Sequence, residues 1–244
     1  MDEIDPLPEL ERGRKQPYVR QSYKVLERAH SSVEQLFAAA GALEAVRREA
    51  NSSKKGRKAR LEVDILRSAI VMTSAGLDAS MKRLVNDVGR ELIVKRGSSA
   101  RKQYQQYLKE KMPQSSVAKD FRDAVVADEP GENLLAFYLA ERTKSSYQGS
   151  NDLLARVKRV LGISNAAVDD HDVMRLDPFF RARNQIVHDM DLKDITTKSI
   201  ARVHRDAETV AGQCNAVFDV AVLLIRGAAE ACWEIQDMHQ VEEW

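Results

Sequence analysis

The stretch LEVDILRSAIVMTSAGLDASMKRLVNDVGRELIVK, from Leu61 to Lys95, decides the fold class. Apolar residues recur in it every three or four positions, which is the spacing of one face of an α-helix. No proline interrupts it, and Gly97-Ser98-Ser99 ends it. The pattern predicts one long helix whose inner face packs against other helices. The positions that we assign to that face are Leu61, Ile65, Ile70, Leu77, Met81, Leu84, Val88 and Leu92.

The rest of the chain has the same helical character. The sequence is poor in glycine and proline and rich in good helix formers, which favours an all-α protein. Helical periodicity predicts a long N-terminal helix over residues 17–50 and a long C-terminal helix over residues 197–238. Shorter helices are expected at residues 101–111, 116–127, 133–146, 151–161 and 178–190. We expect an N-terminal helix and basic linker in residues 1–60, and a helical domain in residues 61–244, packed together as one compact unit.

Composition excludes several classes of function. The net charge of +1 gives no global nucleic-acid footprint, so any such surface must be local. The acidic start of the chain lacks the apolar segment of a secretory leader, and the apolar run at residues 220–225 is too short to span a membrane. Cys214 and Cys232 would lie about 27 Å apart on one helix, so they cannot form a disulfide with each other. These features favour a cytoplasmic protein with buried thiols.

Metal and cofactor sites are not predicted. No Cys/His set has the spacing of a zinc site, and no glycine-rich loop could hold a phosphate. The acidic turn around His171 is expected to cap a helix. His30, at the polar margin of the first helix, and His204 and His239, on exposed parts of the last helix, are expected to have no function.

A basic loop connects the first two long helices. Lys54, Lys55, Arg57 and Lys58 lie in it. Such a run is usually a solvated connector, and contact with an RNA backbone is the alternative.

The chemistry-bearing motif is Arg183-Asn184-Gln185-Ile186-Val187-His188. Asp177-Pro178 predicts the start of its helix, with Asp at the N-cap and Pro at the first helical position. At 3.6 residues per turn, Asn184 and His188 stack one turn apart, with Arg183 beside them. A cation, an amide and an imidazole would then surround one phosphate. RNA carries its own nucleophile, the 2′-hydroxyl, so a proton acceptor and a cation are enough to cleave it without a metal.

The motif, followed by Asp189 and a long C-terminal helix, resembles the signature of the HEPN superfamily. Two further segments are similar to the RiboL-PSP-type branch of that superfamily, Leu66 to Val85 and Tyr147-Gln148-Gly149-Ser150-Asn151. The resemblance covers roughly residues 60–235, and only the Arg-Asn-x-x-x-His element in it is specific. Met190 stands where some toxins of the superfamily carry a regulatory Tyr, so control through that residue is not expected.

The resemblance implies a HEPN-like helical bundle that acts as a metal-independent endoribonuclease, a toxin or defence effector restrained by an antitoxin or another regulatory protein. It also implies a homodimer in which two motifs build one cleft. The catalytic residues would be Arg183, Asn184 and His188, and Asn184 would orient the imidazole. The alternative is a catalytically inactive HEPN-like module that binds RNA, nucleotides or proteins.

Two carboxylates could support the site. Asp189 follows the motif directly, and Asp78 lies on the inner stretch of the helix that spans residues 61–95. Asp78 could pair with Arg183 or His188, because a buried carboxylate needs a partner. An ion pair with Lys82, one turn further along the same helix, is the equally open alternative.

Overall fold

The computed structural model describes residues 4–10, 16–50, 60–114 and 118–241, except for the side chains of residues 16, 60 and 234–241. Their regular secondary structure is entirely helical, as predicted, and the strand-like pairing among them is a single antiparallel bridge between Leu192 and Arg202. No helix in these ranges is long and apolar enough to cross a bilayer.

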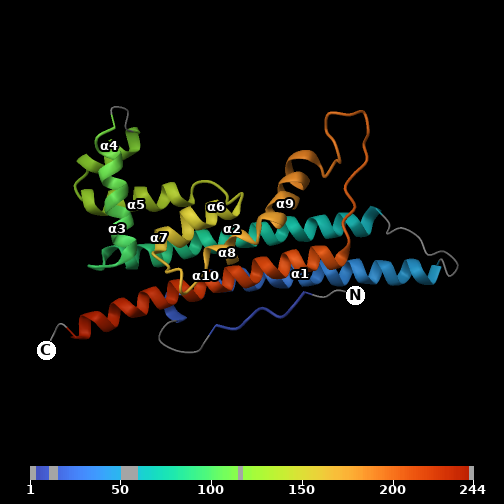
Figure 1. Cartoon of the computed structure of the whole chain (residues 1–244), viewed down its shortest axis with the longest axis horizontal. Helices are drawn as coiled ribbons and strands as arrows, with labels where there is room; N and C mark the ends of the chain where they lie inside the picture. Colours follow the sequence, from blue (N-terminus) through green and yellow to red (C-terminus); the bar gives the residue numbers. More distant parts are fainter. Residues whose placement is uncertain (1–3, 11–15, 51–59, 115–117, 242–244) are drawn as a thin grey trace.

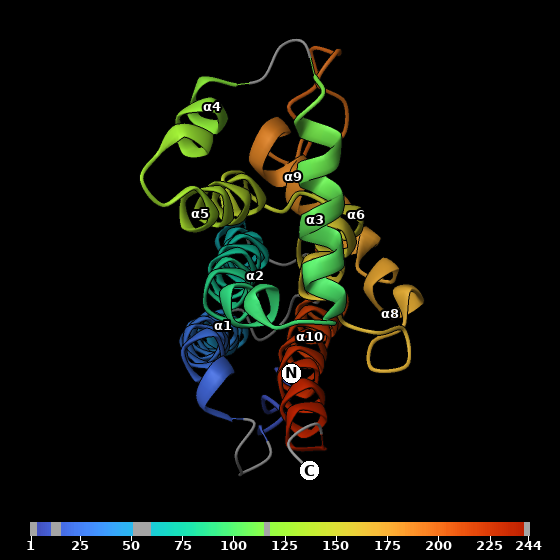
Figure 2. The same ribbon diagram turned by 90° about the vertical axis from the view of Figure 1, so that its left-hand side faces the viewer.

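Three long helices form the base of the molecule. They are α1 (Gln16–Ala50), α2 (Arg60–Val94) and α10 (Ala207–Val241). Figures 1 and 2 show α1 running antiparallel to α2 and α10, with the shorter helices above them. The long amphipathic patterns therefore produce a layer of packed helices.

The shorter helices stand on this base in two groups (Figure 1). The first group projects from one end of α2 and comprises α3 (Ser99–Lys111), α4 (Lys119–Val126) and α5 (Pro130–Thr143). The second group comprises α6 (Ser150–Leu153), the π-helical turn η1 (Leu154–Lys158), α7 (Arg159–Leu161), α8 (Asp170–Met174) and α9 (Asp177–Asp189). The side chain of Asp169 caps α8 by accepting from the backbone N of His171 at 2.8 Å, so the acidic turn is a helix cap, as expected.

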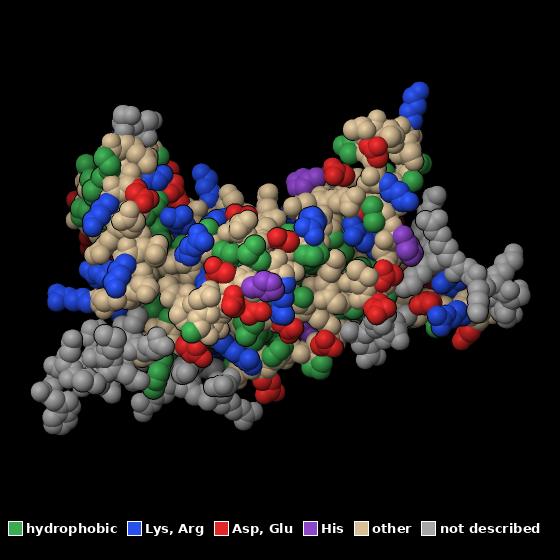
Figure 3. All heavy atoms as spheres, viewed as in Figure 1, with side chains coloured by type: hydrophobic (Ala, Val, Ile, Leu, Met, Phe, Trp, Pro, Cys, Tyr) green, Lys and Arg blue, Asp and Glu red, His purple; other side chains and the backbone are tan. Residues whose placement is uncertain are grey.

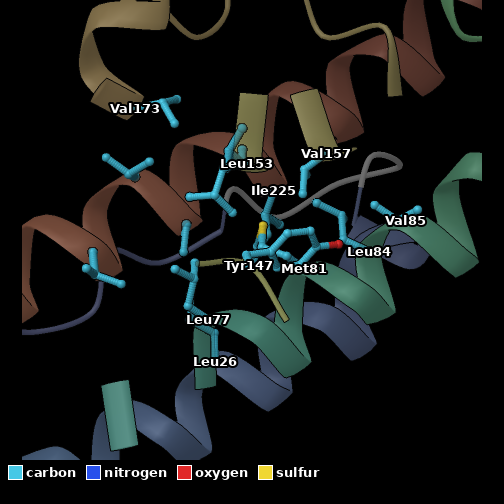
Figure 4. Packing of buried hydrophobic residues seen from close by; sticks show 14 of the residues in the cluster. Leu26, Leu77, Met81, Leu84, Val85, Tyr147, Leu153, Val157, Val173 and Ile225 are labelled. Atoms are coloured by element: carbon cyan, nitrogen blue, oxygen red, sulfur yellow. The ribbon is translucent and has the colours of Figure 1, made fainter. Parts of the chain in front are cut away.

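One hydrophobic core joins the layers. Figure 4 shows Leu26 of α1, Leu77 and Met81 of α2 and Ile225 of α10 meeting around the ring of Tyr147. The same core continues from Ile4 near the N-terminus to Cys232 on α10.

The predicted inner face of α2 is wrong at its first position. Leu61 is 60% exposed, whereas the next residue, Glu62, is buried. Glu62 forms an ion pair with Arg47 of α1 at 2.9 Å. The inward-facing residue at this end of α2 is therefore Glu62, which is paired with a charged residue of α1, and not Leu61.

The predicted start of the last helix, at residue 197, is also wrong. The backbone N of Thr196 donates to the carboxylate of Asp194 at 2.8 Å, which forms a turn instead of a helix. The chain then comes back alongside itself, with the backbone N of Lys193 donating to the carbonyl of Ala201 at 2.8 Å. Helix α10 starts only at Ala207, where the carboxylate of Asp206 accepts from the backbone N of Thr209 at 2.8 Å.

The predicted position of His30 at the polar margin of its helix is wrong as well, because this side chain is buried. Its Nε2 is 2.8 Å from the carbonyl oxygen of Asp5, and its ring contacts Phe218 of α10 edge-on at 4.9 Å. Asp5 in turn accepts from the amide of Asn215 at 2.8 Å. His30 therefore fixes the N-terminal segment 4–10 across α1 and α10.

The thiols of Cys214 and Cys232 are free and buried, as predicted. Burial raises the pKa of Cys214 to about 12 and that of Cys232 to about 11. Both thiols are therefore uncharged core groups at neutral pH.

Candidate active site

Helix α9 carries the motif. Its inner face buries Phe179, Phe180 and Ile186, which fixes the rotation of the helix on the core. Asp177 is the first helical residue and does not cap the helix, contrary to the prediction. Its carboxylate instead accepts a hydrogen bond from the hydroxyl of Ser150 on α6.

Arg183 and Asn184 form one unit. Both side chains are half-buried, and Nη1 of Arg183 donates to Oδ1 of Asn184 at 2.9 Å. Nδ2 of Asn184 donates to the carbonyl oxygen of Gln148 at 3.3 Å. The amide therefore ties the guanidinium to the loop before α6. Its hydrogen bonds go to Arg183 and Gln148, so the expected role of orienting the imidazole of His188 is not seen in this chain.

His188 differs from these two residues in having no fixed partner. It is exposed, one turn beyond Asn184, in the last turn of α9. No residue of the described ranges forms a hydrogen bond or an ion pair with its imidazole. The side chain is therefore open to solvent, as proton transfer to a ligand requires.

The three segments that carry the family resemblance meet at this place. Gln148, which receives the bond from Asn184, follows Tyr147, whose backbone N donates to Oδ1 of Asp78 on α2 at 2.9 Å. Asp78 also pairs with Lys82 at 2.7 Å. Of the two alternatives for Asp78, the ion pair with Lys82 is the one observed. Its carboxylate positions the loop that holds Asn184 and contacts neither Arg183 nor His188.

The other predicted supporting residues add little to the geometry. Asp189 ends α9, and its carbonyl oxygen accepts from the backbone N of Leu192 at 3.0 Å. Lys54, Lys55, Arg57 and Lys58 lie outside the described residues.

A buried charge cluster beyond His188 was not predicted from the sequence. Met190 and Asp191 have left-handed backbone conformations, with φ of 53° and 60°. The fully buried carboxylate of Asp191 accepts from Nε of Arg67 on α2 at 2.7 Å and from Nη2 of Arg205 at 2.6 Å. Two consecutive non-glycine residues in this conformation cost about 1–2 kcal/mol each. The ion pairs offset that cost and fix the turn that ends α9.

The cluster extends to a second aspartate. Asp64 of α2 accepts from Arg67 at 2.8 Å and from Arg202 at 2.7 Å, and Nε of Arg202 donates to the carbonyl of Met190 at 2.9 Å. We call Asp64, Arg67, Asp191, Arg202 and Arg205 the Asp191 cluster. Its only signal in the sequence is the set of charged residues at inward helical positions and in the loop, which does not specify their pairing.

The surface beside the motif is open and partly apolar. Val187 and Met190 are 46% and 65% exposed. A groove of about 500 Å³ lies between α9 and α2 and is lined by Val71, Met72, Ala75, Ile186 and Met190, among others. Figure 3 shows that this side of the molecule is hollowed between the α3–α5 projection and the projection formed by α9 and the following loop.

The site therefore combines an anchored guanidinium, an anchored amide and a free imidazole on an open surface. This set can bind a phosphate and transfer a proton. In the part of the chain that the structure describes, no three His, Cys, Asp or Glu side chains come together as metal ligands.

No protein-family model, curated protein or solved structure matches the chain.

Proposed function

We propose that the protein is an endoribonuclease that cleaves RNA without a metal, through Arg183, Asn184 and His188. One observation carries the proposal. His188 is exposed, has no hydrogen-bond or ion-pair partner among the described residues, and lies one turn beyond Asn184, whose side chain holds the guanidinium of Arg183. A structural histidine in a folded protein usually has a partner, as His30 has here. A free imidazole beside a fixed cation is what general acid–base chemistry on a phosphodiester needs.

In the proposed reaction, His188 accepts the proton of the ribose 2′-hydroxyl. The 2′-oxygen forms a bond to phosphorus, and Arg183 stabilises the negative charge of the phosphorane. The bond from phosphorus to the 5′-oxygen breaks, and that oxygen takes a proton from a second His188 or from water. The products are a 2′,3′-cyclic phosphate and a 5′-hydroxyl. Asn184 holds the guanidinium through its 2.9 Å hydrogen bond.

A second His188 requires a second copy of the chain. The exposed side chains of Val187 and Met190 and the apolar groove over α2 border the motif, which suits a surface that a partner covers. We propose a homodimer that is symmetric about this face, so that each copy offers the same groove and the same imidazole. The role that fits such an enzyme is that of a cytoplasmic toxin or defence effector under the control of an antitoxin or another regulatory protein.

Cleavage of RNA by the purified protein tests the proposal. Total cellular RNA is incubated with the wild type and with His188→Ala, Arg183→Ala and His171→Ala. His171 is exposed on α8 and serves as a matched control. We expect the first two variants to lose about 10²-fold or more in rate, as for loss of a general base or of an oxyanion donor. Equal cleavage by the wild type and His188→Ala would refute the mechanism. No cleavage by the wild type would favour an inactive module that binds RNA, nucleotides or proteins.

Subunit mixing tests the shared site. If both His188 side chains are needed, random exchange of equal amounts of wild type and His188→Ala leaves about a quarter of the activity, because only wild-type homodimers act. Sedimentation should show a dimer in every mixture. A linear fall to half activity, or an active monomer, would show that each chain holds a complete site.

A further inference from the structure

A second cavity lies beside the end of α9. It has a volume of about 1000 Å³ and is enclosed by the loop at residues 192–204 and the first turns of α2. Met190 lines both this cavity and the groove over α2, so the cavity begins two residues beyond His188. Its volume is at the upper end of the range for small-ligand clefts, about 300–1000 Å³.

The cavity presents positive charge that nothing in the described part of the chain neutralises. Lys193, Lys198 and His204 line it, and none of them has an ion pair with a described residue. Among the described residues that line it, none is acidic. The carboxylate nearest along the chain, Asp194, is turned to the backbone N and the hydroxyl of Thr196, at 2.8 and 2.6 Å. Figure 3 shows Lys and Arg side chains standing out on the loop that projects at the upper right.

The floor of the cavity adds to this charge. Arg67 and Arg202 line it but are already bound within the Asp191 cluster. That cluster holds three arginines against two aspartates, which leaves one positive charge in excess. An anion in the cavity would thus be attracted by the two lysines and by the floor.

The remaining wall is aliphatic. Leu192, Ile200 and Val203 line it, and Ile200 is 84% exposed, so its side chain is accessible to a ligand. A ligand that binds both the basic side chains and the aliphatic wall needs a negative charge next to a flat or apolar group. A nucleotide has this chemistry, since its phosphate suits the lysines and its base suits the aliphatic wall.

We propose that this cavity binds a nucleotide unit, with its phosphate at Lys193, Lys198 and His204 and its base against Ile200 and Leu192. The unit belongs either to an RNA strand or to a free nucleotide. The RNA source rests on the proposed function, because the cavity would then hold the substrate strand next to His188. His204, expected to be a solvated helix residue without a role, becomes part of a binding site.

Salt-dependent RNA binding tests the assignment. The full chain carrying His188→Ala, which keeps the RNA intact, is titrated into a fluorescein-labelled oligouridylate of about 12 nucleotides, and anisotropy is followed between about 50 and 200 mM salt. Each phosphate contact with single-stranded RNA contributes about 0.7 to the slope of log affinity against log salt. Adding Lys193→Gln and Lys198→Gln removes the lysine contacts to one phosphate, so it should lower the slope by about 0.7 and weaken binding on the order of tenfold.

The matched control is the pair Lys102→Gln and Lys109→Gln. Both lysines are exposed on α3, at the other end of the molecule, and their removal changes the net charge equally (Figure 1). We expect this pair to leave the slope unchanged. Equal slopes for the Lys193/Lys198 pair and its parent, or an equal fall for both pairs, would overturn the proposal.

Competition identifies the source of the nucleotide. Displacement of the labelled RNA by adenosine monophosphate assigns the cavity to a single nucleotide, and lysine-dependent binding that resists it assigns the cavity to a strand. Displacement by polyglutamate as effective as that by unlabelled RNA would overturn the assignment in favour of an acidic peptide. Cleavage is measured separately on chains that retain His188. Lysine-dependent binding without cleavage would refute only the proposed enzyme, and cleavage with lysine-independent binding would refute only this cavity.

Discussion

Replacement of Asp191 by alanine should destabilise the protein more than any other single change in the loop at residues 190–206. Its carboxylate has no solvent exposure and binds two arginines, Arg67 and Arg205, which are themselves mostly buried. The substitution removes the negative charge and leaves both guanidinium groups in place. It also leaves the left-handed backbone at φ 60° with a residue that disfavours it.

The magnitude follows from the burial of the pair. Loss of one partner of a buried ion pair costs about 3–5 kcal/mol. Arg67 keeps Asp64 at 2.8 Å and the carbonyl of Val203 at 2.7 Å, so the lower part of that range applies. We expect the free energy of unfolding to fall by about 3 kcal/mol for Asp191→Ala. Asp191→Asn keeps an acceptor oxygen and tolerates the left-handed conformation, so we expect a loss of about 1.5–3 kcal/mol, the range for a hydrogen bond to a charged group.

Urea denaturation followed by circular dichroism measures both values. The control is Asp194→Asn, an exposed residue of the same loop. The amide oxygen of Asn can still accept from the backbone N and the hydroxyl of Thr196, so the midpoint should change little. Domains have a total stability of about 5–15 kcal/mol, so the Asp191 variants remain folded without denaturant. A midpoint and slope for Asp191→Ala equal to those of the wild type would show that the cluster does not stabilise the fold.

Three further predictions concern the tyrosines, the thiols and the reaction. The hydroxyl of Tyr147 is buried without a hydrogen-bond partner in the described structure, whereas that of Tyr107 donates to the carboxylate of Glu141. In urea denaturation, Tyr147→Phe should therefore leave the free energy of unfolding equal or raise it. Tyr107→Phe should lower that free energy by about 1 kcal/mol. Burial raises the thiol pKa of Cys214 from 9.0 to about 12 and that of Cys232 to about 11, so their contribution to stability is complete below pH 9 and is lost as the pH rises toward those values. Iodoacetamide should accordingly label neither thiol of the native protein at pH 8 and both in urea, and labelling of the native protein would contradict their burial. RNA cleavage should persist in EDTA, because the proposed proton transfer and charge stabilisation need only side chains of the protein. Rescue of a chelated enzyme by Mg²⁺ would refute metal-independent chemistry.

The spacing of apolar residues was sufficient to predict most of the helices. Helical periodicity predicted the long helices α1 and α2 within one residue at each described end, because each buries a continuous apolar face. The predicted end of the helix over residues 151–161 is confirmed, because Gly162 follows α7 with a left-handed φ of 66°, where a Cβ would lie 2.7 Å from the backbone N of Ala100. The start of α10 could not be predicted in this way. Residues 197–206 have no strong breaker, and the turn at Asp194 and the Asp191 cluster hold them out of the helix.

The candidate site was predictable only in part, for a similar reason. The spacing within the motif placed Asn184 and His188 one turn apart, since both lie on one helix. The partners of the motif come from far along the chain. Asn184 binds a carbonyl 36 residues earlier, and Arg67 binds Asp191 across 124 residues. Contacts between residues so far apart in the sequence depend on how the helices pack, and no local sequence pattern predicts them.

The arrangement of these distant partners bears on how the site would act. Helix α9 is held at its first residue by Ser150, in its middle by the loop at Gln148, and beyond its end by the Asp191 cluster. Its backbone is therefore fixed at three places, while the imidazole of His188 has no hydrogen-bond or ion-pair partner in the described ranges. A group that must accept and release a proton needs rotational freedom and access to its ligand. A rigid helix backbone keeps such a group at its place in the site while its side chain rotates. The left-handed turn at Met190 and Asp191 follows two residues after His188, and the ion pairs of Asp191 with Arg67 and Arg205 enforce it. The same cluster that holds this turn therefore also fixes the end of the helix that carries His188.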